Sequence, residues 1–466
     1  MKNHAFLFRI CAIAALLFPV GLLAQQQNAP LSLSLKQAQD YAIINNINAK
    51  NSAIDIKLAK KKIWETTAIG LPQVNAQANY QHLFKVPVLS LGGSSFLATK
   101  LPAGSVITSD DITNENVYLG FTPSDPIALG VKDNTTLDIT VSQLIFSGEY
   151  LVGLQAAKVF SEISEQSQKK TELDLKESVG NTYSLVLVLE QSKKTLDQSL
   201  DNLKKTLADM REMNKQGFIE NTDVDQIELT SLNLTNGVNT LSRQIQASRD
   251  LLKFQMGLPF DNEIVLTDNL EATAGTLMLE SVVSAKFNVD NNIDYQILGV
   301  QEKLGKLNLK REQSGYLPSL SAVYLHSEKL KKPAFDFAPT DVFQLSLNIP
   351  IFSSGQRIVK VQQRRLELEK ITNTKTNVAN GLQLEFVNGR NEMASAYEKF
   401  LNEKKNIELT NRIYEKTLIK YKNGLSSSLD LTNAQSQYLT AQSNYYTAIY
   451  ALITAKNKLD KLTNNL

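Results

Sequence analysis

The chain has almost no cysteine. The only one among its 466 residues is Cys11, which lies in an apolar run over residues 10–23. The run follows two basic residues and is followed by Ala24, after which cleavage is expected. This is the pattern of a secretory signal peptide. An N-terminal membrane anchor is the alternative, but the run is too short to cross a bilayer. Residues 1–24 are therefore predicted to be a signal peptide, and the mature chain then has no disulfide and no thiolate metal ligand.

Histidine is scarce as well. Of three histidines, only His82 and His326 lie outside the predicted leader. Each stands alone near the end of a predicted strand, without the other ligands that a metal site needs, so both are interpreted as surface histidines. The sequence also lacks a phosphate-binding glycine loop and a nucleophile motif. It predicts no enzyme, no cofactor and no metal site.

The predicted mature chain also has no excess of charge of either sign and no long apolar run. Removing Lys2 and Arg9 with the leader lowers the basic count from 49 to 47, which equals the 47 acidic residues. A neutral chain gives no reason to expect a nucleic-acid partner. No later segment reaches the length of about 18 apolar residues that a membrane helix needs. If the chain crosses a membrane, it must therefore do so with β-strands.

Two long stretches contain no proline. They run from Gly148 to Gly217 and from Gly355 to Gly424, at a constant offset of 207 residues. Helices of this length reach roughly 100 Å, which an ordinary globular domain does not need. Each is followed by a glycine turn and a return segment with apolar residues in heptad spacing, which indicates packed antiparallel helices.

Short alternating segments precede both long helices. In the first, Val74, Ala76 and Ala78 alternate with polar residues, which predicts a strand with one apolar and one polar face. Strands are expected at about 72–82, 137–146, 318–326 and 342–352. Residues 85–135 read as a long loop, which is expected on the outer side of a membrane barrel.

The chain is thus predicted to be a tandem repeat of helix, strand, strand, long helix, turn and helix. Repeat 1 covers residues 25–257 with a helical hairpin over 148–256, and repeat 2 covers 277–466 with a hairpin over 355–462. Residues 258–276 form an equatorial insert between them. The predicted fold class is mainly α with a transmembrane β-barrel portion.

Four strands cannot close a barrel, so the chain is expected to oligomerise. A dimer would supply eight strands and a trimer twelve. Because eight strands leave an interior filled by side chains, only the homotrimer gives a pore. The strands' polar faces would line this pore, and their apolar faces would contact outer-membrane lipid.

Taken together, the order of these motifs resembles the TolC family of outer-membrane efflux ducts. The resemblance rests on the Leu-Pro strand entries, the Phe-Ser-Gly and Phe-Ser-Ser-Gly exits, the Met-Gly-Leu-Pro stop and the paired glycine turns, and it covers both repeats. It implies a trimeric twelve-strand barrel in the outer membrane of a Gram-negative bacterium, continued by a helical barrel in the periplasm. It also implies a periplasmic adaptor and an inner-membrane transporter as partners.

The resemblance further assigns roles at the tips of the two hairpins. It places Gly217, Phe218, Gly424 and Leu425 at the contact with the adaptor. The gate residues that it implies are Asp223, Tyr421, Asp430 and Asn433.

In the family, the positions of Asp223 and Tyr421 are linked in the closed tip, and Asp430 joins an acidic ring. This chain has Asn433 where the family has a second acid, and it lacks an arginine that is usual near Ser426. The alternative for each aspartate is a helix N-cap.

The function predicted from this resemblance is a passive outer-membrane duct of a tripartite efflux or type I secretion system. The alternative is a periplasmic coiled-coil structural or adaptor protein without a pore. That class has helical hairpins but does not need amphipathic strands around each one.

Overall fold

A computed structural model describes residues 30–89, 94–100, 102–103, 105–106, 108–110, 117–122, 127–275, 287–333 and 336–466. The predicted signal peptide lies outside the described residues. The chain divides into two compact units. One comprises the described parts of Met1–Ala53, Ser167–Tyr295 and Val378–Leu466, and the other those of Ile54–Gln166 and Gln296–Asn377. Each unit takes segments from both predicted repeats.

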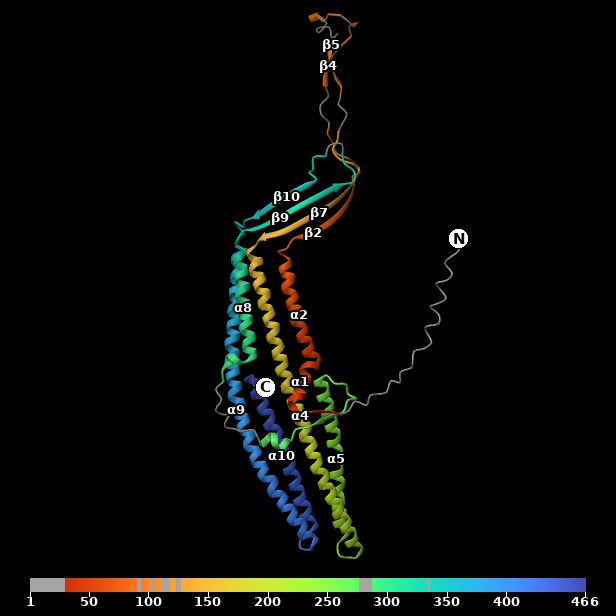
Figure 1. Cartoon of the computed structure of the whole chain (residues 1–466), viewed down its shortest axis with the longest axis vertical. Helices are drawn as coiled ribbons and strands as arrows, with labels where there is room; N and C mark the ends of the chain where they lie inside the picture. The colour runs from red at the N-terminus through yellow and green to blue at the C-terminus, as the bar shows by residue number, and fades with distance from the viewer. Residues whose placement is uncertain are drawn as a thin grey trace, which may run out of the picture. The chain divides into compact units, whose positions relative to one another are not determined.

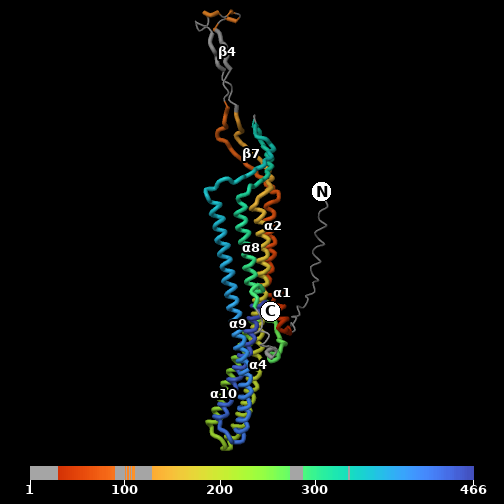
Figure 2. The backbone as a smooth tube through the Cα atoms, turned by 90° about the vertical axis from the view of Figure 1, so that its left-hand side faces the viewer, coloured from red at the N-terminus to blue at the C-terminus, as the bar shows by residue number. Residues whose placement is uncertain are grey.

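Two helical hairpins dominate the fold. The first joins α4 (Gly148–Lys215) to α5 (Asn221–Met256), and the second joins α9 (Gln356–Lys422) to α10 (Ser428–Leu462). Both hairpins turn at the same end of the first unit (Figure 2). None of the helices in the described ranges combines the length and apolar character of a membrane-crossing helix. The mainly helical fold predicted from the sequence is confirmed.

The first unit is held together by apolar residues in heptad positions of the hairpins. Near the turns, Leu203 and Met210 of α4 pack with Ile227 of α5 and Leu431 of α10 in one cluster. Farther from the turns, small and large residues alternate along α10, and the small ones are Ala441, Ala448 and Ala455, all buried. Small residues at alternate positions let the neighbouring helices approach closely.

The predicted equatorial insert contains a short strand and a short helix. Strand β8 (Ile264–Leu266) pairs in parallel with β1 (Leu31–Leu33), and α6 (Leu270–Gly275) follows. The hydroxyl of Tyr183 in α4 donates to the carbonyl of Leu33 at 2.9 Å. Burial raises the pKa of Tyr183 to about 12, so the hydroxyl remains a donor throughout the physiological range. It fastens β1, which pairs with β8 of the insert, to the long helix.

The opening helix of repeat 1, predicted as one segment from Leu35 to about Thr66, is interrupted. It forms α1 (Leu35–Asn45) and α2 (Ile47–Ala68), because Asn46 adopts an extended backbone. The Asn46 side chain accepts from the amide of Asn48 at 2.8 Å and donates to the carbonyl of Gln255 at 2.7 Å. One asparagine thus caps α2 and binds the end of α5.

The same device occurs in the second repeat. There, η1 (Val289–Asn291) precedes α8 (Ile293–Ser314). Asn292 accepts from the amide of Asp294 at 2.9 Å and donates to the carbonyl of Leu462 at 3.0 Å. Each asparagine therefore joins the start of one helix to the end of the return helix of its own repeat.

The second unit contains a four-stranded antiparallel sheet in the order β10-β9-β7-β2 (Figure 1). Its strands are β2 (Gln73–His82), β7 (Asp133–Phe146), β9 (Ser319–Lys329) and β10 (Asp341–Asn348). The edge strands β10 and β2 come from different repeats.

The long segment over 85–135 is not only loop. It contains β3 (Val88–Leu89) paired with β6 (Ile127–Ala128), and β4 (Ser94–Thr99) paired with β5 (Val117–Thr122). The prediction of a loop over the whole of 85–135 is therefore wrong for these four segments.

Candidate gate at the helical tips

Each hairpin turns at a glycine with a left-handed backbone. Gly217 has φ +79° and Gly424 has φ +69°, and a Cβ atom at either position would meet nothing within 4 Å. The amide of Phe218 binds the carbonyl of Met213 at 3.0 Å, and the amide of Leu425 binds that of Lys420 at 2.8 Å. These are the bonds of a Schellman end, in which glycine tolerates the positive φ.

The residue after each glycine is apolar and exposed. The exposed fraction is 72% for Phe218 and 76% for Leu425. The four residues implied as the adaptor contact therefore form two matching turns, each with one apolar side chain in solvent. The contact itself remains a prediction.

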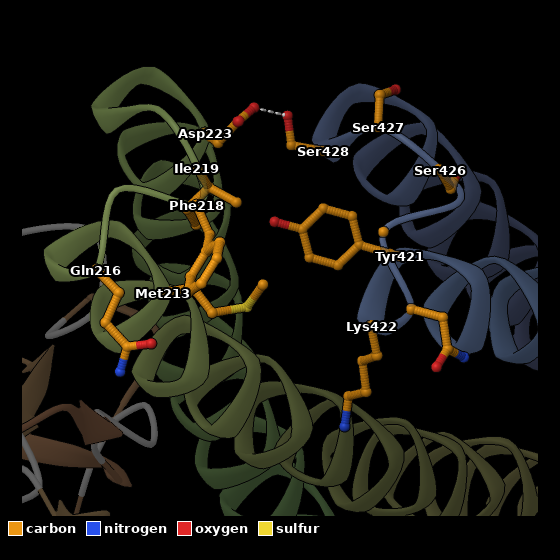
Figure 3. A pocket seen from close by; sticks show the side chains of 12 residues that line it. Met213, Gln216, Phe218, Ile219, Asp223, Tyr421, Lys422, Ser426, Ser427 and Ser428 are labelled. Carbon is orange, nitrogen blue, oxygen red and sulfur yellow. Dashed lines mark hydrogen bonds between the residues drawn. The ribbon is translucent and has the colours of Figure 1, made fainter.

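A cavity of about 680 Å³ lies between the two turns. Tyr421 of α9 points across it toward the side of Phe218 and Ile219 (Figure 3). The Tyr421 hydroxyl is buried and has no hydrogen-bond partner within the described part of the chain. Burial, and then the charge of Asp223, raises the pKa of Tyr421.

Asp223 lines the same cavity, but its bond goes to a different residue. The Oγ of Ser428, the first residue of α10, donates to Oδ1 of Asp223 in α5 (Figure 3). Within one chain, Asp223 is therefore bonded to Ser428 of the other hairpin, and not to Tyr421. The family resemblance did not identify Ser428.

Neither aspartate is an N-cap, so that alternative is wrong. The caps are Glu220 for α5 and Ser427 for α10. Asp430 completes a capping box, because its carboxylate accepts from the Ser427 amide at 3.1 Å and its own amide donates to the Ser427 hydroxyl oxygen at 3.1 Å. The carboxylate also accepts from the Ser427 hydroxyl at 2.8 Å. These bonds hold the pKa of Asp430 below its usual value. Asp430 and Asn433 are both exposed on the first turns of α10.

A polar stripe runs up α10 from Ser428 in steps of seven residues. It comprises Ser428, Gln435 and Gln442, whose exposed fractions are 6%, 1% and 3%. Both polar side-chain atoms of Gln435 and the Oε1 of Gln442 have no hydrogen-bond partner among the described residues. Three polar residues at one heptad position, where apolar residues are usual, are the sequence signal that could have revealed this stripe.

One family model matches the second part of the chain. The profile of the family called outer membrane efflux protein matches residues 308–465. No curated protein sequence matches significantly.

Solved structures match over nearly the whole chain. CusC, a protein studied for transmembrane channel formation, shares 13% identity with a TM-score of 0.69, covering 94% of this chain and 95% of that one. The outer membrane protein VceC of Vibrio cholerae shares 14% identity with a TM-score of 0.66, covering 92% and 96%. The open state of the Neisseria gonorrhoeae MtrE outer membrane channel shares 14% identity with a TM-score of 0.67, covering 92% and 88%. The resemblance predicted from the sequence is confirmed.

Proposed function

We propose that this chain, a TolC-type outer membrane efflux protein by its family match and its fold, is the outer-membrane duct of a tripartite export system. Substrate would pass from an inner-membrane pump, through a periplasmic adaptor, into the helical part of the duct. The duct itself performs no chemistry, so its contribution is a sealed path and a gate.

The observation that carries this proposal is the two-faced sheet. One face is apolar yet exposed: the exposed fraction is 67% for Val74, 67% for Phe343 and 60% for Leu347. On the opposite face, β2 and β7 pair polar residues, Gln73 with Ser142 and Asn75 with Thr140. Strand β9 adds Val323 and Leu325 beside them on that face. A sheet that is mostly apolar on one side and more polar on the other fits lipid outside and water inside.

The two edges of the sheet point to a trimer. Among the described residues, strands β10 and β2 each pair on one side only, and unpaired backbone groups in lipid cost several kcal/mol each. Pairing β2 of one copy with β10 of the next would satisfy both edges. Three copies would then close twelve strands around a water-filled pore.

In the proposed assembly the tips form the gate. Gly217, Phe218, Gly424 and Leu425 would meet the adaptor, since they present exposed apolar turns. The exposed Asp430 carboxylates would attract cations to the narrow mouth, and the bond between Ser428 and Asp223 would hold the two hairpins of each copy together.

Single-channel recording in planar bilayers tests the proposal. The purified protein should insert from detergent and form channels that have a small conductance and stay closed most of the time. Breaking the tip contact with Asp223→Ala should increase the conductance while the oligomer remains intact. A well-folded protein that inserts but never conducts, with or without the substitution, would refute the duct.

The alternative function is a periplasmic structural protein without a pore. Membrane fractionation separates the two. A duct should stay with the outer membrane and need detergent for its release, whereas the alternative predicts release by osmotic shock.

A further inference from the structure

One acidic residue interrupts the otherwise uncharged centre of the sheet's polar face. Asp138 of β7 lies directly between Gln77 of β2 and Ser327 of β9 in the strand register. It is half-buried, and it alternates with Leu137 and Ile139, which belong to the apolar face.

The carboxylate of Asp138 is held by donors from three strands. Ser327 donates to Oδ1 at 2.5 Å, and Asn79 and Thr136 donate to Oδ2 at 3.2 and 3.4 Å.

No basic side chain forms an ion pair with Asp138 within the described residues. The other charged residue on the polar face of these four strands is Lys329, and it is paired with Asp336 at 2.5 Å. Asp138 therefore contributes an uncompensated negative charge to this face.

The second repeat lacks this charge. Leu137 and Ile139 of β7 correspond to Phe343 and Leu345 of β10 at an offset of 206 residues, so Asp138 corresponds to Gln344. The Gln344 amide donates to the hydroxyl of Ser346 at 3.2 Å. The two hairpins of the sheet thus present a carboxylate and a neutral amide at equivalent places.

We propose that Asp138 determines the cation preference of the outer part of the pore. This inference rests on the proposed function, in which the polar face lines a trimeric channel and three copies of Asp138 form a ring. The ring is separate from the Asp430 carboxylates at the helical tips. Because a Debye length is about 10 Å at 0.1 M salt and about 3 Å at 1 M, the preference should be marked only at low ionic strength.

The test is the ratio of potassium to chloride permeability, obtained from reversal potentials under a salt gradient. All channels carry Asp430→Asn, which removes the charge at the tips. At about 0.1 M salt, Asp138→Asn should lower the ratio about two- to fivefold, because it removes three negative charges that are only partly screened at this salt concentration. Gln344→Glu should raise the permeability ratio, because it doubles the number of carboxylates in the ring. At 1 M salt the variants should converge.

A matched control lies on the same strand. Asp133 is on the opposite face of β7, where it accepts from Tyr80 at 3.1 Å, so Asp133→Asn should leave the ratio unchanged. Conducting channels in which Asp138→Asn also leaves the ratio unchanged would overturn the assignment. Channels that never conduct would overturn the proposed function instead, so the two failures are distinguishable.

Discussion

At the scale of single residues, the link between the hairpins depends on which hydroxyl binds Asp223. The structure gives this bond to Ser428, while the Tyr421 hydroxyl stays buried without a partner in the described chain. A hydrogen bond to a charged group contributes about 1.5–3 kcal/mol. The serine, rather than the tyrosine, is therefore expected to bias the tip toward closure.

Ser428→Ala and Tyr421→Phe form a matched pair of variants, since each removes one hydroxyl. Ser428→Ala should raise the single-channel conductance and lower the melting temperature of the helical part. Tyr421→Phe should change neither, or should stabilise slightly by removing an unpaired buried hydroxyl. If Tyr421→Phe opens the channel as much as Ser428→Ala, the tyrosine binds the aspartate across copies in the closed assembly.

Asp430 gives a prediction for pH. The pKa of its carboxylate is lower in the folded chain than in the unfolded chain, chiefly because of the Ser427 hydrogen bond. The carboxylate therefore contributes to stability at pH values above its unfolded pKa of 3.8. This contribution is lost as the pH falls through the folded pKa. The difference in melting temperature between the wild type and Asp430→Asn should therefore be equal at pH 7 and pH 5 and shrink below pH 4. A difference that already vanishes at pH 5 would show that the carboxylate is not held by the cap.

At the scale of elements, the polar stripe on α10 weakens the packing of the hairpins. Gln435 is almost fully buried, and neither polar atom of its side chain has a partner in the described chain. An unsatisfied buried polar group costs about 1–3 kcal/mol. We infer that the stripe keeps this part of the bundle from packing too tightly to open.

Gln435→Leu tests this inference, because leucine has a similar size and needs no partner. The variant should raise the melting temperature and lower the fraction of time that the channel is open. Leu439→Ala changes a partly buried residue of α10 that packs against the cluster containing Leu431, and it should lower the melting temperature. A destabilised Gln435→Leu variant would show that the amide is satisfied in the assembly.

The elements themselves could largely be predicted from the sequence. Strict alternation around Val74 and Ile139 gives the strands, and a proline-free stretch between glycines gives each long helix. The break at Asn46 could not be predicted, because the apolar pattern continues through it and its cause is a bond to Gln255, 209 residues away. The bond between Ser428 and Asp223 was missed for the same reason: it depends on how the two hairpins pack.

At the scale of the whole molecule, one chain would supply a third of the proposed pore. In the described part of the chain the sheet has two unpaired edges and an exposed apolar face. The unpaired edges are incompatible with a single copy in lipid. The proposed gate and the proposed ring of Asp138 both assume the same threefold assembly. Trimer formation is thus the central claim.

Light scattering of the mature protein purified in mild detergent, with the detergent mass subtracted, tests this claim most directly. The protein mass should correspond to three copies, and heating should convert the complex to single chains because no disulfide joins them. A monodisperse monomer under the same mild conditions would contradict the account.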